Sequence, residues 1–259
     1  MNADSETGVH IRMLCICVLV IFTISHSPNV NGQEHDLKDT LLLSINFDED
    51  AASSHTDAHA EGIKGNGLDL KNRHDIPKLP DIGLEQFSGS EDFSVSVWVK
   101  SKSNTLEPAV ILSNADFSTK PMGIYGRRRI SNGFTLYSQN GAWGWNIGNG
   151  RLHYNYEPIA ADQAVNHNKW HNLVFSYNAV KKEARLFYDG INRVILSLGD
   201  LDGSDFRSDL PLRIGGDNNV SPGDKTFSGV IDELQIWDCV ITSEEVKKSY
   251  TEPNLRIWM

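Results

Sequence analysis

The segment spanning residues 126–156 gathers the side chains best suited to binding a ligand. It combines the consecutive arginines Arg127, Arg128 and Arg129 with Tyr137, Trp143, Trp145, Tyr154 and Tyr156. Aromatic rings stack on the C–H faces of pyranoses, and the planar fork of arginine grips hydroxyl or acidic groups. We therefore take Trp143, Trp145, Arg128 and Tyr137 as the candidate ligand-binding residues.

The two tryptophans of this segment admit a second interpretation. Trp143 and Trp145 are two residues apart, so they share one face if this part of the chain is a strand. That face could be exposed to a sugar, or it could fill the core between two sheets, where aromatic side chains dominate burial. Three arginines in a row on an acidic chain favour an anionic ligand, such as a uronic-acid or sulfated glycan; the alternative is a solvated loop.

The carboxylates show no arrangement typical of glycoside hydrolysis. That reaction needs two carboxyl groups facing each other across the sugar. Asp232 and Glu233 are adjacent in a predicted strand, which directs them to opposite faces. We therefore predict no catalytic residues and a protein that is not an enzyme.

A histidine pair, His167 and His171, has the spacing of some zinc sites. Residues four apart share a face in a helix, but residues 170–177 have the pattern of a strand. We expect His171 to pack in or beside the sheet and His167 to lie in the preceding loop, without zinc.

Charge and composition narrow the possible partners. The 259 residues include 24 Lys and Arg against 34 Asp and Glu, which gives a formal net charge of −10. Binding to the nucleic-acid backbone requires a basic surface, so we expect no nucleic-acid partner. The hydrophobic content of 39% is sufficient for a sizeable core in one domain.

The amino-terminal region predicts export. Residues 13–24 form an apolar run that is too short to span a bilayer but suits the core of a signal peptide. Small residues at Val30 and Gly32 predict cleavage before Gln33, which makes residues 1–32 the signal peptide. Asp4 and Glu6 offset the charge of Arg12, so a misassigned start codon and an uncleaved anchor stay open as alternatives. The mature chain would be secreted or periplasmic, would have no membrane span, and would keep Cys239 as its single cysteine, without an internal disulfide.

Short apolar alternations separated by Gly, Asn and Asp predict many antiparallel strands. They cover residues 40–47, 65–70, 93–100, 109–113, 133–139, 142–147, 151–154, 170–177, 183–188, 191–197, 212–215 and 230–237. Residues 48–66 carry no periodicity and predict a polar loop. Thr242 and Glu245 form a capping box, which predicts one short helix that starts at about Ser243.

Several of these blocks resemble laminin-G-like domains of the concanavalin A-like superfamily. The closing segment 227–250 is similar to a sequence motif of the family, Phe-x-Gly-x-Ile-Asp-Glu, which is followed by a short helix. Similar matches occur, in family order, at residues 65–70, 93–100, 170–175, 186–190 and 212–215. The resemblance implies an all-β jelly-roll sandwich of two antiparallel sheets with one short C-terminal helix. No internal repeat or Pro/Ser-rich linker divides the mature chain, so we predict a single domain over residues 37–256.

The resemblance also implies a range of functions. Related domains often carry a structural calcium, and Asp48, Asp75 and Asp232 are the matching positions. They are often attached to glycan-degrading enzymes, so we predict a secreted, non-catalytic, lectin-like module that binds a polysaccharide within a glycan-degradation system. Two alternatives stay open: a calcium-dependent protein-protein adhesion module, and an unrecognised polysaccharide lyase or hydrolase.

Overall fold

The computed structural model describes most of the chain between residues 37 and 252. The described residues are 37–48, 59–70, 89–106, 108–115, 117–122, 127–130, 132–149, 153–156, 164–199, 207–216 and 226–252. Side chains are not described for β6, β7, β10 and the last residue of β9. The predicted signal peptide, residues 1–32, lies outside these ranges.

One layer of the fold is an eight-stranded sheet in which every pair of neighbouring strands is antiparallel. Its order is β13-β12-β11-β4-β15-β3-β2, and β1 also pairs with β15. The strands are β1 (Leu41–Ile45), β2 (His59–Glu61), β3 (Asn66–Asp69), β4 (Phe93–Ser101), β11 (Trp170–Asn178), β12 (Glu183–Tyr188), β13 (Ile191–Ser197) and β15 (Gly229–Trp237). The last strand, β15, therefore lies inside the sheet rather than at its edge.

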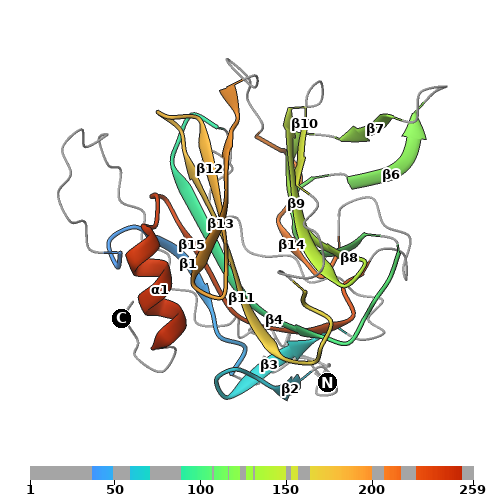
Figure 1. The fold of residues 1–259 in the computed structure, drawn as a ribbon, viewed down its shortest axis with the longest axis vertical. Coiled ribbons are helices and arrows are strands. Elements are labelled where there is room, and N and C mark those ends of the chain that lie inside the picture. The colour runs from blue at the N-terminus through green and yellow to red at the C-terminus, as the bar shows by residue number, and fades with distance from the viewer. Residues whose placement is uncertain are drawn as a thin grey trace, which may run out of the picture.

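The second layer is a five-stranded antiparallel sheet in the order β10-β9-β8-β5-β14. Its strands are β5 (Ala109–Ser113), β8 (Asn132–Gln139), β9 (Ala142–Asn149), β10 (His153–Tyr156) and β14 (Arg213–Ile214), and β6 (Phe117–Met122) and β7 (Arg127–Ile130) form a separate ribbon. Figure 1 shows the two sheets facing each other, with α1 (Ser243–Thr251) outside the eight-stranded sheet and the β6–β7 ribbon on the far side of the five-stranded sheet. The predicted two-sheet sandwich with one short helix is confirmed.

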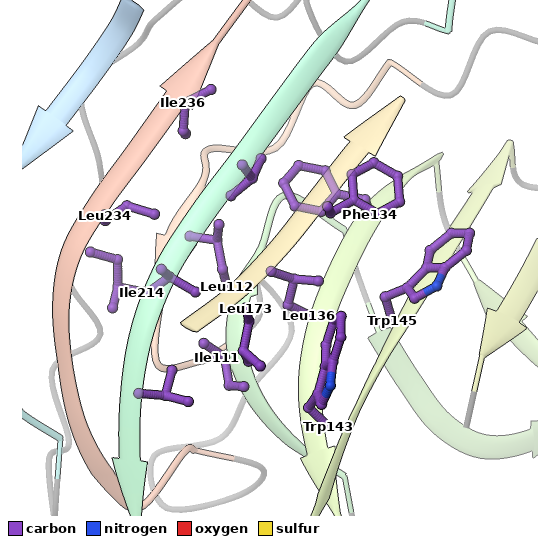
Figure 2. Close-up of a cluster of buried hydrophobic side chains, with 14 of the residues drawn as sticks. Ile111, Leu112, Phe134, Leu136, Trp143, Trp145, Leu173, Ile214, Leu234 and Ile236 are labelled. Atoms are coloured by element: carbon purple, nitrogen blue, oxygen red, sulfur yellow. The ribbon is translucent and has the colours of Figure 1, made fainter. Parts of the chain in front are cut away.

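The main core fills the space between the two sheets (Figure 2). In the five-stranded sheet, one inward row crosses four strands at the register positions Ile214, Leu112, Leu136 and Trp145. Directly opposed residues on antiparallel strands share a face, so these four side chains lie on the same side of the five-stranded sheet. On that side they belong to one apolar cluster with Leu173, Leu234 and Ile236 of the other sheet.

The positions of Trp143 and Trp145 correct one of our expectations. Trp143 is 0% exposed and Trp145 is 1% exposed, and both belong to the inter-sheet core. The ring of Trp145 packs against Phe175 with a centroid distance of 5.1 Å. Because neither indole has a free face, these residues stabilise the sandwich and do not stack on a sugar in this conformation.

A second apolar cluster joins the helix to the outer face of the eight-stranded sheet. Val246 of α1 packs with Val174, Phe187, Trp237 and Ile241. The helix begins with the predicted capping box: Thr242 Oγ1 accepts the Glu245 N–H at 3.3 Å, and Glu245 Oε2 accepts the Thr242 N–H at 2.7 Å. The closing segment therefore packs α1 against part of the outer face of the eight-stranded sheet.

The closing strand β15 departs from simple alternation. Its pairing with β4 shifts between Asp232 and Gln235, and Glu233 has a φ of 47°. This bulge places both Ile231 and Leu234 in the inter-sheet core, although strict alternation predicted opposite faces for them. A regular strand would place Asp232 and Leu234 on one face, and the bulge breaks that alternation.

Two further differences concern short or polar strands. The predicted polar loop contains β2, which pairs with β3 from His59 to Glu61, and the β6–β7 ribbon was not predicted. Among the described residues, no helix is long and apolar enough to cross a bilayer.

Candidate functional site

A row of polar residues crosses the outer face of the five-stranded sheet. Arg213, Ser113, Thr135 and Asn146 occupy directly opposed positions on β14, β5, β8 and β9. Each lies one position along its strand from a member of the inward apolar row. We call these four residues the polar row; Asn155 of β10 occupies the next register position after Asn146.

Two members of the polar row have their hydrogen bonds within the sheet. Ser113 Oγ and Thr135 Oγ1 lie 2.8 Å apart, and Ser113 Oγ also accepts the Ala115 N–H at 3.0 Å. Both side chains are fully buried. Buried hydroxyl groups that are satisfied in this way help to hold neighbouring strands in register.

Asn146 differs from these two residues. It is 1% exposed, and neither its amide oxygen nor its amide nitrogen has a hydrogen-bond partner among the residues that the structure describes. Leaving a buried polar group without a partner costs about 1–3 kcal/mol. An amide with one acceptor and two donor hydrogens could instead pair with the hydroxyl groups of a ligand, because each hydroxyl both donates and accepts.

The positions beside Asn146 are glycines, which are buried but carry no side chains of their own. By strand alternation Gly144 and Gly148 share its face of β9, and Gly148 lies opposite Gly133 of β8. Glycine inside a strand often marks a place where a ligand or another backbone comes close. The polar row is therefore bordered by main chain that bears no side chains.

Tyr137 lies on this same outer face, opposite Gly144. It packs with Val110 in a small cluster separate from the main core and is 1% exposed. Tyr137, a predicted ligand-binding residue, therefore lies on the same face as the polar row, but its ring is buried. A ligand that contacts Tyr137 or Asn146 must displace what covers this face.

The remaining predicted site residues have varied positions. Arg128 lies in β7, whose side chains are outside the described residues, and Asp75 also lies outside them. Asp48 is exposed, and its Oδ1 accepts the Asn66 N–H at 2.8 Å. No group of three His, Cys, Asp or Glu side chains that could hold a metal ion occurs in the described part of the chain. The calcium site thus stays a prediction.

Asp232 is fully buried and anchors the turn between β2 and β3. Its Oδ2 accepts the N–H groups of Ile63 at 2.9 Å and Lys64 at 3.2 Å, and its Oδ1 accepts the Glu233 N–H at 2.8 Å. Burial raises the pKa of Asp232 to about 7, although these backbone donors oppose the shift. Both carboxylate oxygens of Asp232 accept hydrogen bonds from main-chain N–H groups, so this side chain stabilises the turn between β2 and β3.

The sequence of β9 contains a signal for the polar row. In β9, Trp143, Trp145 and Ile147 alternate with Gly144, Asn146 and Gly148. Once the tryptophans are assigned to the core, the intervening positions must face outward. Asn146 is thereby selected as the polar side chain at the centre of that outer face.

The chain belongs to the concanavalin A-like lectin/glucanase superfamily. The Laminin_G_3 family model, described by that superfamily name, matches residues 74–247. No curated protein matches the chain in sequence. The family includes binding and catalytic proteins, so membership establishes the fold and leaves the activity to the site.

Solved structures with the same fold include bacterial toxin and sialidase domains. The binding domain of Paraclostridial Mosquitocidal Protein 1 aligns with a TM-score of 0.61 and 16% identity over 84% of this chain and 53% of that one. The botulinum neurotoxin serotype D ligand-binding domain in complex with N-acetylneuraminic acid gives a TM-score of 0.59 and 18% identity over 85% and 52%. This chain thus spans about half of those two chains.

A third similar structure corresponds to a complete small module. It is the CBM40 of the Ruminococcus gnavus IT-sialidase bound to α2,3-sialyllactose, with a TM-score of 0.54 and 16% identity. The alignment covers 71% of this chain and 95% of that one. At these identities the similarity concerns the fold.

Proposed function

We propose that this protein is an exported carbohydrate-binding module that holds a glycan on the outer face of its five-stranded sheet without cleaving it. The observation that carries the proposal is the buried Asn146 amide, which has no hydrogen-bond partner among the described residues. Once what covers this face is displaced, sugar hydroxyls would satisfy both ends of that amide, and the glycines beside it would allow a ring close to the strand.

The preferred ligand class is an anionic glycan. Arg213 contributes a positive charge at one end of the polar row, and arginine recognises carboxylates through paired hydrogen bonds. Two of the similar structures are described with sialyllactose and with N-acetylneuraminic acid, both acidic sugars. The proposal includes export of the protein by a signal peptide that contains the apolar segment 13–24. It also includes a role in a system of glycan-degrading enzymes.

The test is a glycan array of neutral and anionic polysaccharides, followed by calorimetry on the best ligand. We expect Asn146→Ala to weaken the affinity by about tenfold, which corresponds to about 1.4 kcal/mol. The matched control is Asn172→Ala, because Asn172 is equally buried but belongs to the eight-stranded sheet, where it donates to Ser96. Equal affinities for the wild type and Asn146→Ala would contradict the proposed site.

Two other results would redirect the proposal. Absence of binding to every glycan would favour a protein-protein adhesion module, which a calcium-dependent pull-down would then test. Release of reducing ends or unsaturated uronides by the pure protein would show that it cleaves polysaccharide.

A further inference from the structure

A histidine pair lies where β11 begins, away from the polar row. His167 Nδ1 is 3.3 Å from His171 Nε2, and the ring centroids are 5.3 Å apart with an interplanar angle of 57°. Sequence spacing predicted separate positions because β11 is a strand. The intervening Asn168, with a left-handed φ of 59°, turns the chain so that the loop histidine returns to the strand histidine.

Asp189 fixes the orientation of the strand histidine. Its Oδ2 lies 2.9 Å from His171 Nδ1, and its Oδ1 accepts the Asn172 N–H at 2.9 Å. A carboxylate only accepts hydrogen bonds, so the ring proton of neutral His171 belongs on Nδ1. The lone pair of His171 Nε2 then accepts a hydrogen bond from His167 when His167 carries its proton on Nδ1. When His167 carries its proton on Nε2 instead, the facing nitrogens of both rings have lone pairs available to a metal ion.

The surroundings hold the ring of His171 and the backbone on either side of His167 in place. Tyr188 stacks on His171 with a centroid distance of 5.0 Å and an interplanar angle of 20°. The loop is anchored on either side of His167, because the Val165 N–H donates to the Gly141 carbonyl at 2.8 Å and the Asn168 N–H donates to the Ser101 carbonyl at 2.7 Å. His171 is buried, whereas His167 is exposed to solvent.

We propose that His167 Nδ1 and His171 Nε2 together bind one divalent transition-metal ion, such as Zn²⁺ or Cu²⁺. Two nitrogen ligands in a tetrahedral zinc site lie about 3.3–3.4 Å from each other, given Zn–N bonds of about 2.0–2.1 Å. The observed separation of 3.3 Å matches that value. Asp189 acts as the positioning residue, in the carboxylate–histidine–metal arrangement common to such sites.

The proposed site is open rather than closed. Among the described residues, no third His, Cys, Asp or Glu completes a ligand set with this pair. Two protein ligands leave further coordination positions for water or for oxygen atoms of a bound molecule, and the exposed side of His167 gives access to them. Cu²⁺ should bind more tightly than Zn²⁺, as nitrogen sites generally prefer it.

The experiment uses the full chain purified without a polyhistidine tag and treated with EDTA. Cu²⁺ binding is followed by electron paramagnetic resonance, and Zn²⁺ binding by competition with a chromophoric chelator. We expect saturable binding of both ions and nitrogen hyperfine splitting from two imidazoles. The variant His167→Ala should reduce the splitting to one imidazole and weaken the affinity more than tenfold, and Asp189→Asn should weaken it by about tenfold.

The control variant is His59→Ala, which removes a histidine from β2 and should leave the affinity and the spectrum unchanged. His167 is exposed, so its replacement should not disturb folding; circular dichroism checks this for Asp189→Asn, which also alters a hairpin turn. Absence of saturable binding, or the same affinity and spectrum in His167→Ala as in the wild type, would overturn the proposal.

Discussion

Both sheets bury part of their outer faces, but the buried side chains on the two faces are of different kinds. On the eight-stranded sheet, Val174, Phe187 and Trp237 pack under Val246 of the helix. On the five-stranded sheet, the buried outer row is polar and includes Asn146, which has no partner among the described residues. Among the described residues, Asn172 of the eight-stranded sheet lacks a partner for its amide oxygen alone, whereas Asn146 lacks a partner for both ends of its amide. The two faces therefore differ in how far their buried amides are satisfied.

The two faces also differ in free energy. Burying apolar surface under the helix stabilises the fold by roughly 25 cal/mol for each Å² removed from water. Burying an unpaired amide opposes folding, and a polar group left in that state calls for an explanation. A binding function on the five-stranded sheet supplies one, and four measurements probe the contrast.

The largest effect on stability should come from Trp145, the neighbour of Asn146 whose side chain points into the inter-sheet core. Trp145→Ala should lower the free energy of unfolding by about 3–5 kcal/mol, because a buried indole leaves a large cavity. Urea denaturation followed by circular dichroism measures this loss. A loss below about 1 kcal/mol would mean that Trp145 is not part of the core.

The next effect concerns the buried carboxyl on the eight-stranded sheet. The pKa of Asp232 rises from 3.8 to about 7 in the folded protein, so the folded state binds the proton more tightly than the unfolded state does. Its contribution to stability is complete below pH 3.8 and is lost as pH rises to about 7, with a slope of at most about 1.4 kcal/mol per pH unit.

Urea denaturation at a series of pH values compares the wild type with Asp232→Asn. The diagnostic quantity is the slope against pH, because the variant also changes the hydrogen bonds to the turn. The variant should lack this component of the slope; identical slopes in both proteins would contradict the raised pKa.

The third measurement compares the two buried asparagines directly. Asn172→Leu should lower the free energy of unfolding by about 1–3 kcal/mol, because it leaves the buried Ser96 hydroxyl without its donor. Asn146→Leu should change it by less than about 1 kcal/mol or increase it, since no described hydrogen bond is broken. Equal losses in thermal or urea denaturation would remove the distinction between the faces.

The smallest effect should come from the helix that covers the eight-stranded sheet. Thr242→Ala removes the side chain that caps α1 and should cost about 1 kcal/mol. Glycan affinity should not change, because the helix lies on the other sheet. A measurable loss of glycan affinity would contradict this expectation and would show that the two faces are energetically coupled.

Much of the fold could be predicted from alternation and short family phrases. The residues 93–100, 183–188 and 191–197 were placed within one residue of β4, β12 and β13, because apolar side chains at every second position leave little ambiguity. The strand β2 could not be found in this way, since His59, Ala60 and Glu61 offer no apolar face. It exists because β3 pairs with it.

The site was harder to predict than the fold because the decisive information is not local. The pattern of β9 separates Trp145 from Asn146, but it does not say which of the two faces meets the other sheet. The bulge at Glu233 likewise depends on pairing with β4, and the approach of His167 to His171 depends on a turn at Asn168. Tertiary partners determine each of these features.

The place of β15 within its sheet constrains the order of assembly. This strand pairs with β4, with β3, and with β1, whose residues precede it by about 190 positions. During synthesis β1, β3 and β4 therefore keep unpaired hydrogen-bonding edges until residues 229–237 have emerged from the ribosome. Folding should be slow for a chain of this size, and these unpaired edges are where early aggregation would begin.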